Sequence, residues 1–148
     1  MNFPRNILVP IDFSENAEHA LDYAVALAGK LDAKIHLLNV LFLLPLGPEL
    51  AVAMSSVKVD EITRDSKQAL DRLVAARSGK AAFGPTLQKS GDARTLIDET
   101  AAELGADLII MGTHGRRGVS RLLLGSVAES VARTAPCPVL LVRKEQTP

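Results

Sequence analysis

Four short apolar runs, separated by helical patterns, constrain the fold of this chain more than any other feature. They are rich in Val, Ile and Leu and span residues 6–12, 33–40, 106–112 and 137–143. A fifth and weaker candidate spans 83–91. Near-continuous apolar runs of this length are typical of strands that are buried on both faces of a sheet. We therefore predict a sheet that is covered by helices on both sides.

Apolar residues at helical spacing fill the intervals between these runs. Ser14 and Asp92 are residue types that cap helix starts, whereas Gly105 and Pro136 are typical of helix ends. The predicted helices begin after Ser14, cover Ile62 to Val74, run from Asp92 to Gly105, and cover Val127 to Ala135.

Strands and helices that alternate in this way predict an α/β fold with a doubly wound, Rossmann-like parallel sheet. Each parallel pairing needs a right-handed crossover, which places helices on both faces. We expect five strands in the order 3-2-1-4-5 within one domain of residues 1–148. Ligands of such sheets bind beyond the carboxyl ends of the strands, where the strand order reverses. That point lies between the strands 6–12 and 106–112.

A glycine-rich segment, GTHGRRGVSRLLLGS at 112–126, follows one of these two strands. Gly112 and Gly115 allow the chain to turn off the strand and a ligand to approach the backbone. Gly125 and Ser126 stand at the start of the last predicted helix, where free amides and the helix dipole attract phosphate. The spacing matches neither a P-loop nor a dinucleotide fingerprint. The segment is therefore a candidate phosphate site.

A purely structural interpretation of the same helix start stays open. Ser126 and Glu129 match a capping box, in which the two side chains bond to helix-start amides and no ligand is needed. Taken alone, the residues do not decide between capping and phosphate binding.

The spacing Gly112-x2-Gly115-x9-Gly125-Ser126 resembles the nucleotide-binding signature of the universal stress protein family, in its ATP-binding branch. VPIDFSENAEHAL near the start and APCPVLLVR near the end are also similar to segments of that family. The resemblance covers nearly the whole chain. It implies five parallel strands, with ATP bound at their ends.

The resemblance also implies which residues surround the nucleotide. Pro10 and Asp12 would lie at the adenosine end, Val40 against the base, and Met111 and Gly112 beside the ribose and α-phosphate; Gly115, Gly125, Ser126 and Val127 would meet the phosphates. His114, Arg116 and Arg117 could add charge to phosphate oxygens, although solvent exposure is as good an interpretation of each arginine. Without the resemblance, Asp12 would be interpreted as a residue that caps the turn after its strand.

The resemblance implies a nucleotide-dependent switch or stress-response module that holds ATP, or ADP or AMP in its place, with or without Mg²⁺. One alternative is a slow ATPase or phosphotransfer enzyme, which would need a base and a metal clamp that we do not find in the sequence. The other is a dimeric interaction protein that binds no nucleotide. Whether the protein is an enzyme stays open, and we predict no catalytic residue and no metal ligand.

Composition and the remaining motifs bear on partners and location. Seventeen basic and seventeen acidic residues balance, which argues against a nucleic-acid partner. The apolar window 37–54 contains prolines and Glu49, which argues against a membrane span. The single Cys137 and the polar start of the chain favour the cytoplasm. The last strand, 137–143, is an apolar edge that we expect to pair with a second copy in a homodimer.

Overall fold

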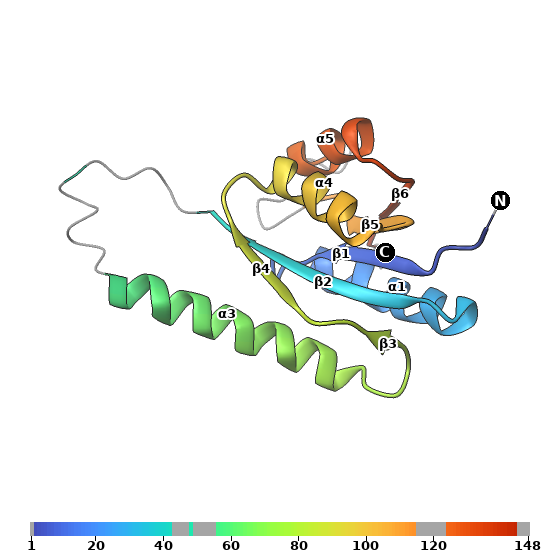
Figure 1. Cartoon of the computed structure of the whole chain (residues 1–148), viewed down its shortest axis with the longest axis horizontal. Helices are drawn as coiled ribbons and strands as arrows, with labels where there is room; N and C mark the ends of the chain where they lie inside the picture. Colours follow the sequence, from blue (N-terminus) through green and yellow to red (C-terminus); the bar gives the residue numbers. More distant parts are fainter. Residues whose placement is uncertain (1, 43–47, 49–55, 115–123, 145–148) are drawn as a thin grey trace, which may run out of the picture.

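The computed structural model describes residues 2–42, 48, 56–114 and 124–144. Its strands all run parallel and lie between two pairs of helices (Figure 1). The strands are β1 (Asn6–Pro10), β2 (Lys34–Leu41), β3 (Ala82–Phe83), β4 (Leu87–Ser90), β5 (Leu108–Gly112) and β6 (Val139–Val142). The helices are α1 (Glu15–Leu31), α3 (Ser56–Ala76), α4 (Ala93–Leu104) and α5 (Ser126–Thr134).

The predicted α/β class is confirmed, and the strand order differs from the prediction in one detail. The order is β3-β2-β1-β5-β6, with β4 also paired to β2. The ends of the four clear strands match the predicted ends to within two residues. The weak candidate at 83–91, however, is two short strands, so the prediction of five strands was wrong.

The division of this segment has a local physical cause. Ile35 pairs with Phe83 and Leu38 pairs with Leu87, so β2 advances by three residues while its neighbour advances by four. One extra residue on one side of a ladder is a bulge. A Cβ on Gly84 would lie 2.6 Å from the His36 ring, and Pro85 has no N–H to donate. The Gly84 N–H still donates to the Ile35 carbonyl at 2.9 Å, so the chain leaves the ladder after Gly84 and rejoins it at Leu87.

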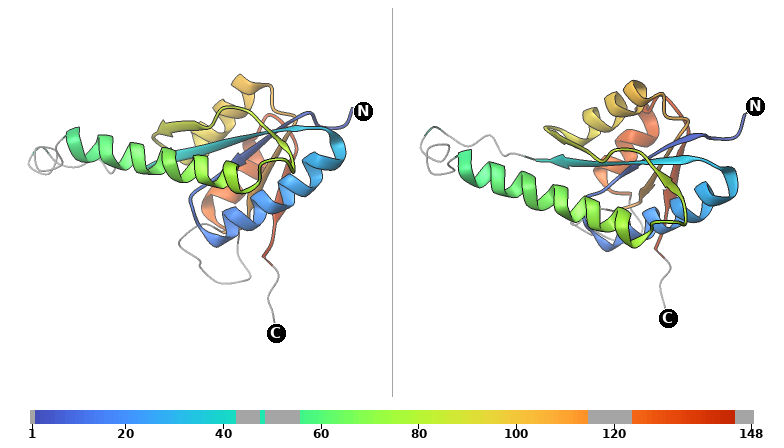
Figure 2. Two further views of the ribbon diagram at one scale, coloured as in Figure 1. Left: turned by 90° about the horizontal axis from the view of Figure 1, so that it is seen from below. Right: turned by 60° about the horizontal axis from the view of Figure 1, so that its bottom comes forward.

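Two apolar cores hold the helices to the sheet. α1 and α3 pack on one face, around Ile7, Val9, Ile35 and Leu37 (Figure 2). α4 and α5 pack on the other face, around residues that alternate with the first set: Leu8, Leu38, Ile109 and Met111. This alternation is the period-two pattern of a strand that is buried on both sides.

The predicted caps of α1 and α4 are confirmed. The Ser14 hydroxyl accepts a hydrogen bond from the Ala17 N–H at 3.1 Å, and Asp92 accepts one from the Arg94 N–H at 3.0 Å. The C-cap of α4 is Gly105, which has a φ of 59°. Among the helices of the described ranges, none is both long enough and apolar enough to cross a membrane.

Candidate functional site

A cavity of about 460 Å³ lies at the carboxyl ends of the central strands, and we call it the strand-end cavity. Nine of the twelve predicted site residues line it: Pro10, Asp12, Val40, Met111, Gly112, His114, Gly125, Ser126 and Val127. The other three, Gly115, Arg116 and Arg117, lie outside the described residues. Segments that are far apart in the sequence meet here because β1 is flanked by β2 and β5, from which the chain crosses to opposite sides. The volume is within the range of small-ligand and cofactor sites.

The turn after β1 brings Asp12 to one wall of the cavity. One carboxylate oxygen of Asp12, Oδ1, accepts hydrogen bonds from the backbone N–H of Ser14, at 2.9 Å, and from the Ser14 hydroxyl. Ser14 in turn caps α1. Asp12 therefore stabilises the turn, as its structural interpretation requires, and it also faces the cavity.

Asn39 holds the end of β1 in place, a role that the sequence analysis missed. The Ile11 N–H donates to the Leu38 carbonyl at 2.8 Å, and the Ile11 carbonyl accepts from Asn39 Nδ2 at 2.8 Å. Asn39 is only 4% exposed. Its side chain therefore replaces the ladder partner that Ile11 loses where β1 leaves the sheet. A polar residue within the apolar half of its strand, Leu37 to Leu41, was the signal that could have identified it.

The start of α5 forms another wall of the cavity. The Gly125 N–H donates to the Thr113 carbonyl at 2.7 Å, which ties the helix start to the end of β5. Gly125 is the N-cap residue, with a φ of −61°, and no side-chain bond caps the helix. Ser126 is the first helical residue, so the capping-box alternative that the sequence left open for Ser126 and Glu129 does not apply. A box requires the serine itself at the N-cap position.

The structure adds a second reason for a glycine at position 112. A Cβ at this position would meet the Asn16 backbone at 3.0 Å. Gly112 is therefore needed so that the start of α1 can approach the end of β5. Its neighbour Thr113 is buried, and Thr113 Oγ1 lies in a hydrogen bond of 3.0 Å with His114 Nδ1. This bond orients the imidazole at the edge of the cavity.

The remaining lining is largely apolar, and the sequence analysis had not selected it. It comes from the strand ends, from α1 and from the starts of α4 and α5: Ile11, Ala17, Leu38, Phe42, Thr113, Ala93, Ile97 and Ala128. Leu38 and Phe42 share the parity of Val40, which could have indicated them. Ala93 and Ile97 reach the cavity because β4, which precedes α4, pairs with β2. The sequence does not show this long-range pairing.

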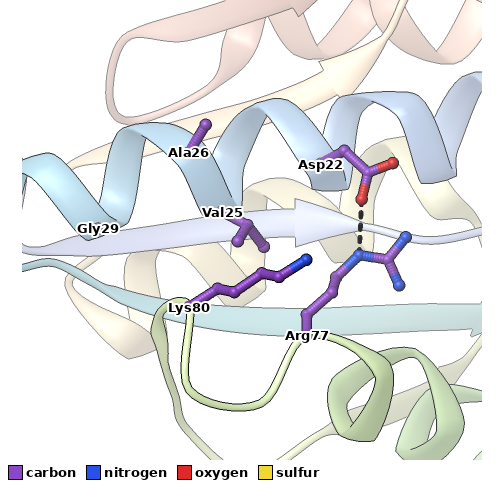
Figure 3. Close-up of a pocket in the computed structure, with 6 residues that line it drawn as sticks. All are labelled: Asp22, Val25, Ala26, Gly29, Arg77 and Lys80. Atoms are coloured by element: carbon purple, nitrogen blue, oxygen red, sulfur yellow. Dashed lines mark hydrogen bonds and ion pairs between the residues drawn. The ribbon is translucent and has the colours of Figure 1, made fainter.

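A second cavity, of about 480 Å³, lies along the exposed side of α1, and we call it the helix-face cavity (Figure 3). Its lining is Asp22, Val25, Ala26, Gly29, Arg77 and Lys80. Arg77 Nε donates to the Asp22 carboxylate at 2.8 Å, and Arg77 Nη1 donates to the Leu73 carbonyl at 3.1 Å. None of the predicted site residues is part of this lining.

Other residues with reactive side chains do not form a site among the described residues. Burial and the nearby Lys34 ammonium lower the pKa of His36. Burial, together with the Asp107 and Asp98 carboxylates, raises the pKa of the half-buried Cys137 thiol. A raised pKa keeps this thiol protonated and unreactive. Within the ranges that the structure describes, no three His, Cys, Asp or Glu side chains gather closely enough to hold a metal.

Known proteins are similar to nearly the whole of this chain in sequence and in structure. The family model of the universal stress protein family matches residues 4–143. A curated relative from Staphylococcus haemolyticus, named as a universal stress protein, is 33% identical over 150 aligned positions, which cover 97% of this chain and 87% of the relative. The structure of the universal stress protein UspA from Lactobacillus plantarum matches with a TM-score of 0.77 and 29% identity, covering 94% of this chain and 97% of that one. A universal stress protein solved in complex with cAMP matches with a TM-score of 0.64 and 28% identity, covering 94% and 96%.

Proposed function

Since the chain belongs to the universal stress protein family, we propose that it binds ATP, or another adenine nucleotide, in the strand-end cavity and acts as a nucleotide-dependent switch. One observation carries the proposal. The cavity joins an apolar wall to a helix start whose N-cap, Gly125, has no side-chain cap bond. A base fits the first environment and a phosphate the second, because helix-start amides and the helix dipole favour anions. A family neighbour that was solved with cAMP supports the same ligand class.

In this proposal residues 1–148 form one nucleotide-binding domain. Val40 faces the base, Asp12 and Pro10 the adenosine, and Met111 and Gly112 the ribose and α-phosphate. Gly125, Ser126 and Val127 bind the phosphates, together with His114 and with Gly115, Arg116 and Arg117 of the glycine-rich segment. If Mg²⁺ accompanies ATP, Asp12 is the carboxylate of the cavity lining that could share it with the phosphates.

Hydrolysis or phosphoryl transfer is the alternative from another class. Asp12 and His114 are the titratable side chains among the described residues of the lining. Both already take part in hydrogen bonds, with Ser14 and Thr113 respectively. A base for an attacking water must be within hydrogen-bond reach of it and correctly protonated. We therefore favour binding without rapid turnover, which the rate of phosphate release from bound ATP would measure.

The deciding experiment is to denature freshly purified protein and to identify any released nucleotide by chromatography, followed by titration of nucleotide-free protein with ATP, ADP, AMP and GTP. We expect a bound adenine nucleotide, or saturable binding of one, with no more than slow release of phosphate. The absence of both bound nucleotide and saturable binding would favour an interaction protein that uses no nucleotide.

We also propose that β6 pairs with the β6 of a second copy in a homodimer. β6 lies at one end of the sheet, is regular over its whole length, and keeps Val139, Leu140 and Leu141 half-buried. The opposite edge is interrupted at the Gly84 bulge, which discourages pairing. Light scattering should report a dimer at micromolar concentration, and Leu141→Pro, which removes an N–H that faces away from β5, should give monomer or aggregate. A wild-type monomer would contradict the proposal.

A further inference from the structure

Phe42 stands at the rim of the strand-end cavity with 70% of its surface exposed. It belongs to neither apolar core cluster of the described residues. A phenyl ring left in water gives up the free energy that burial would supply, on the order of 2 kcal/mol for a large apolar side chain. Phe3 is similarly exposed, at 75%, but it does not line the cavity.

The direction of β2 explains why the Phe42 ring borders the cavity. Leu38, Val40 and Phe42 all line it, at every second position along the chain. Leu37, between two of them, is buried in the core on the other face. Because successive side chains of a strand point to opposite faces, Phe42 continues the same apolar row one step beyond the end of β2.

The start of α4 supplies a second wall beside this row. β4 pairs with β2 up to the pair of Leu41 with Ser90, and the Gly91 N–H then donates to the Leu41 carbonyl at 3.0 Å. Gly91 has a φ of 143°, which favours glycine and turns the chain into α4. Ala93 and Ile97, one helical turn apart, both line the cavity. The small Ala93 leaves room at the place where β2 ends.

From this arrangement we propose that Phe42 is a specificity-determining residue, which stacks on the base of the bound nucleotide in a slot that Ala93 and Ile97 close from the side of α4. The inference rests on the proposed function and deepens it. The slot carries no charged side chain, whereas the start of α5, to which the proposed function assigns the phosphates, forms another part of the lining. Its selectivity therefore comes from the area of the flat ring system, which favours purine over pyrimidine nucleotides.

The first measurement compares AMP and CMP affinities by calorimetry in wild type, Phe42→Ala, Phe42→Leu and the matched control Phe3→Ala. Stacking of a base on an aromatic side chain is lost on substitution by alanine. We expect Phe42→Ala to bind AMP at least fivefold more weakly, about 1 kcal/mol, and to lose most of the preference for AMP over CMP. Phe42→Leu, which keeps apolar area without a flat ring, should lose most of the same affinity, and Phe3→Ala should match wild type.

The second measurement uses the absence of tryptophan from the chain. Phe42→Trp adds a single indole at the cavity rim, and Phe3→Trp adds one away from the cavity. We expect AMP to quench the fluorescence of Phe42→Trp in a saturable manner, with little change in Phe3→Trp. A residue that merely supports the fold would not produce this difference.

The outcomes separate this inference from the proposed function. If wild type and Phe42→Ala bind AMP equally and Phe42→Trp is not quenched, the stacking role is wrong, while nucleotide binding stands. If wild type binds no nucleotide, both fail together. If Phe42→Leu binds as well as wild type, the ring serves only as apolar cover, and the proposed base selection is overturned.

Discussion

Two cavities of nearly equal size, about 460 and 480 Å³, lie on this molecule and differ in almost everything else. The helix-face cavity is built from one stripe of α1 and the turn after α3, and its arginine is already bonded to Asp22 and to the Leu73 carbonyl (Figure 3). The strand-end cavity collects residues from the ends of β1, β2 and β5 and from the starts of α1, α4 and α5. Cavity volume therefore does not show which of the two is a binding site. The chemistry of the lining residues has to show it.

The two linings differ in what their polar groups still offer. In the helix-face cavity the guanidinium of Arg77 already donates to the Asp22 carboxylate and to the Leu73 carbonyl, and the Arg77 side chain is only 12% exposed. In the strand-end cavity the N-cap position of α5 is a glycine without a side-chain cap bond, whereas Ser14 and Asp92 cap α1 and α4. Helix-start amides that no side chain caps, beside an apolar wall, suit a ligand with an anionic and a flat end. We therefore expect substitutions at the two cavities to have opposite consequences.

Gly125→Val should produce the largest loss of nucleotide affinity. A branched Cβ at the α5 start would occupy the space through which a phosphate reaches the amides. We expect ATP to bind at least tenfold more weakly, about 1.4 kcal/mol, in titrations of folded protein. Gly125→Ala, which adds a single methyl group, is the graded control and should fall between wild type and Gly125→Val. A folded Gly125→Val protein with the affinity of wild type would remove the phosphate site from the α5 start.

The residues that cap α1, α4 and α5 show which parts of the molecule can be predicted from sequence. The caps Ser14, Asp92 and Gly105 were predicted correctly because the signal and the structure lie within a few residues of each other. The capping-box alternative at Ser126 does not apply, because the N-cap of α5 is Gly125, whose N–H donates to the Thr113 carbonyl. The sequence pattern alone could not show which of the two residues is the N-cap.

The site divides in the same way. Nine predicted residues line one cavity because the family spacing and the sheet topology both point to the strand ends. Ala93 and Ile97 were not predicted, because their approach depends on the pairing of β4 with β2. The close approach of the Asn16 backbone to Gly112 was not predicted either. Contacts between segments that are far apart in the chain produce no periodic pattern and no motif in the sequence.

Ser126→Ala should have a smaller effect, and it should lower ATP affinity without lowering stability. Ser126 is the first helical residue and makes no cap bond, so its hydroxyl contributes little to the free protein. The loss of one hydrogen bond to a phosphate, with water able to take its place, costs about 1 kcal/mol. We therefore expect a several-fold loss of ATP affinity and an almost unchanged melting temperature without nucleotide.

The matched control for Ser126→Ala is Asp92→Ala, which removes a cap that the structure does contain. It should lower the unfolding free energy of the nucleotide-free protein by about 1 kcal/mol. If Ser126→Ala instead lowered the melting temperature as Asp92→Ala does, with unchanged affinity, Ser126 would be a structural residue and not a phosphate ligand.

Arg77→Ala should have the smallest effect on nucleotide binding, and it tests the role of the helix-face cavity. Arg77 joins the end of α3 to α1 through Asp22, and its buried stem packs beside Val25 in the helix-face cavity. Because Asp22 is largely exposed, the ion pair itself is screened, and most of the loss would come from packing and from the freed Leu73 carbonyl. We expect about 1 kcal/mol less stability in urea unfolding and an ATP affinity within twofold of wild type. If Arg77→Ala weakened ATP binding as strongly as Gly125→Val while the protein stayed folded, the two cavities would be coupled, and the helix-face cavity would be part of the switch.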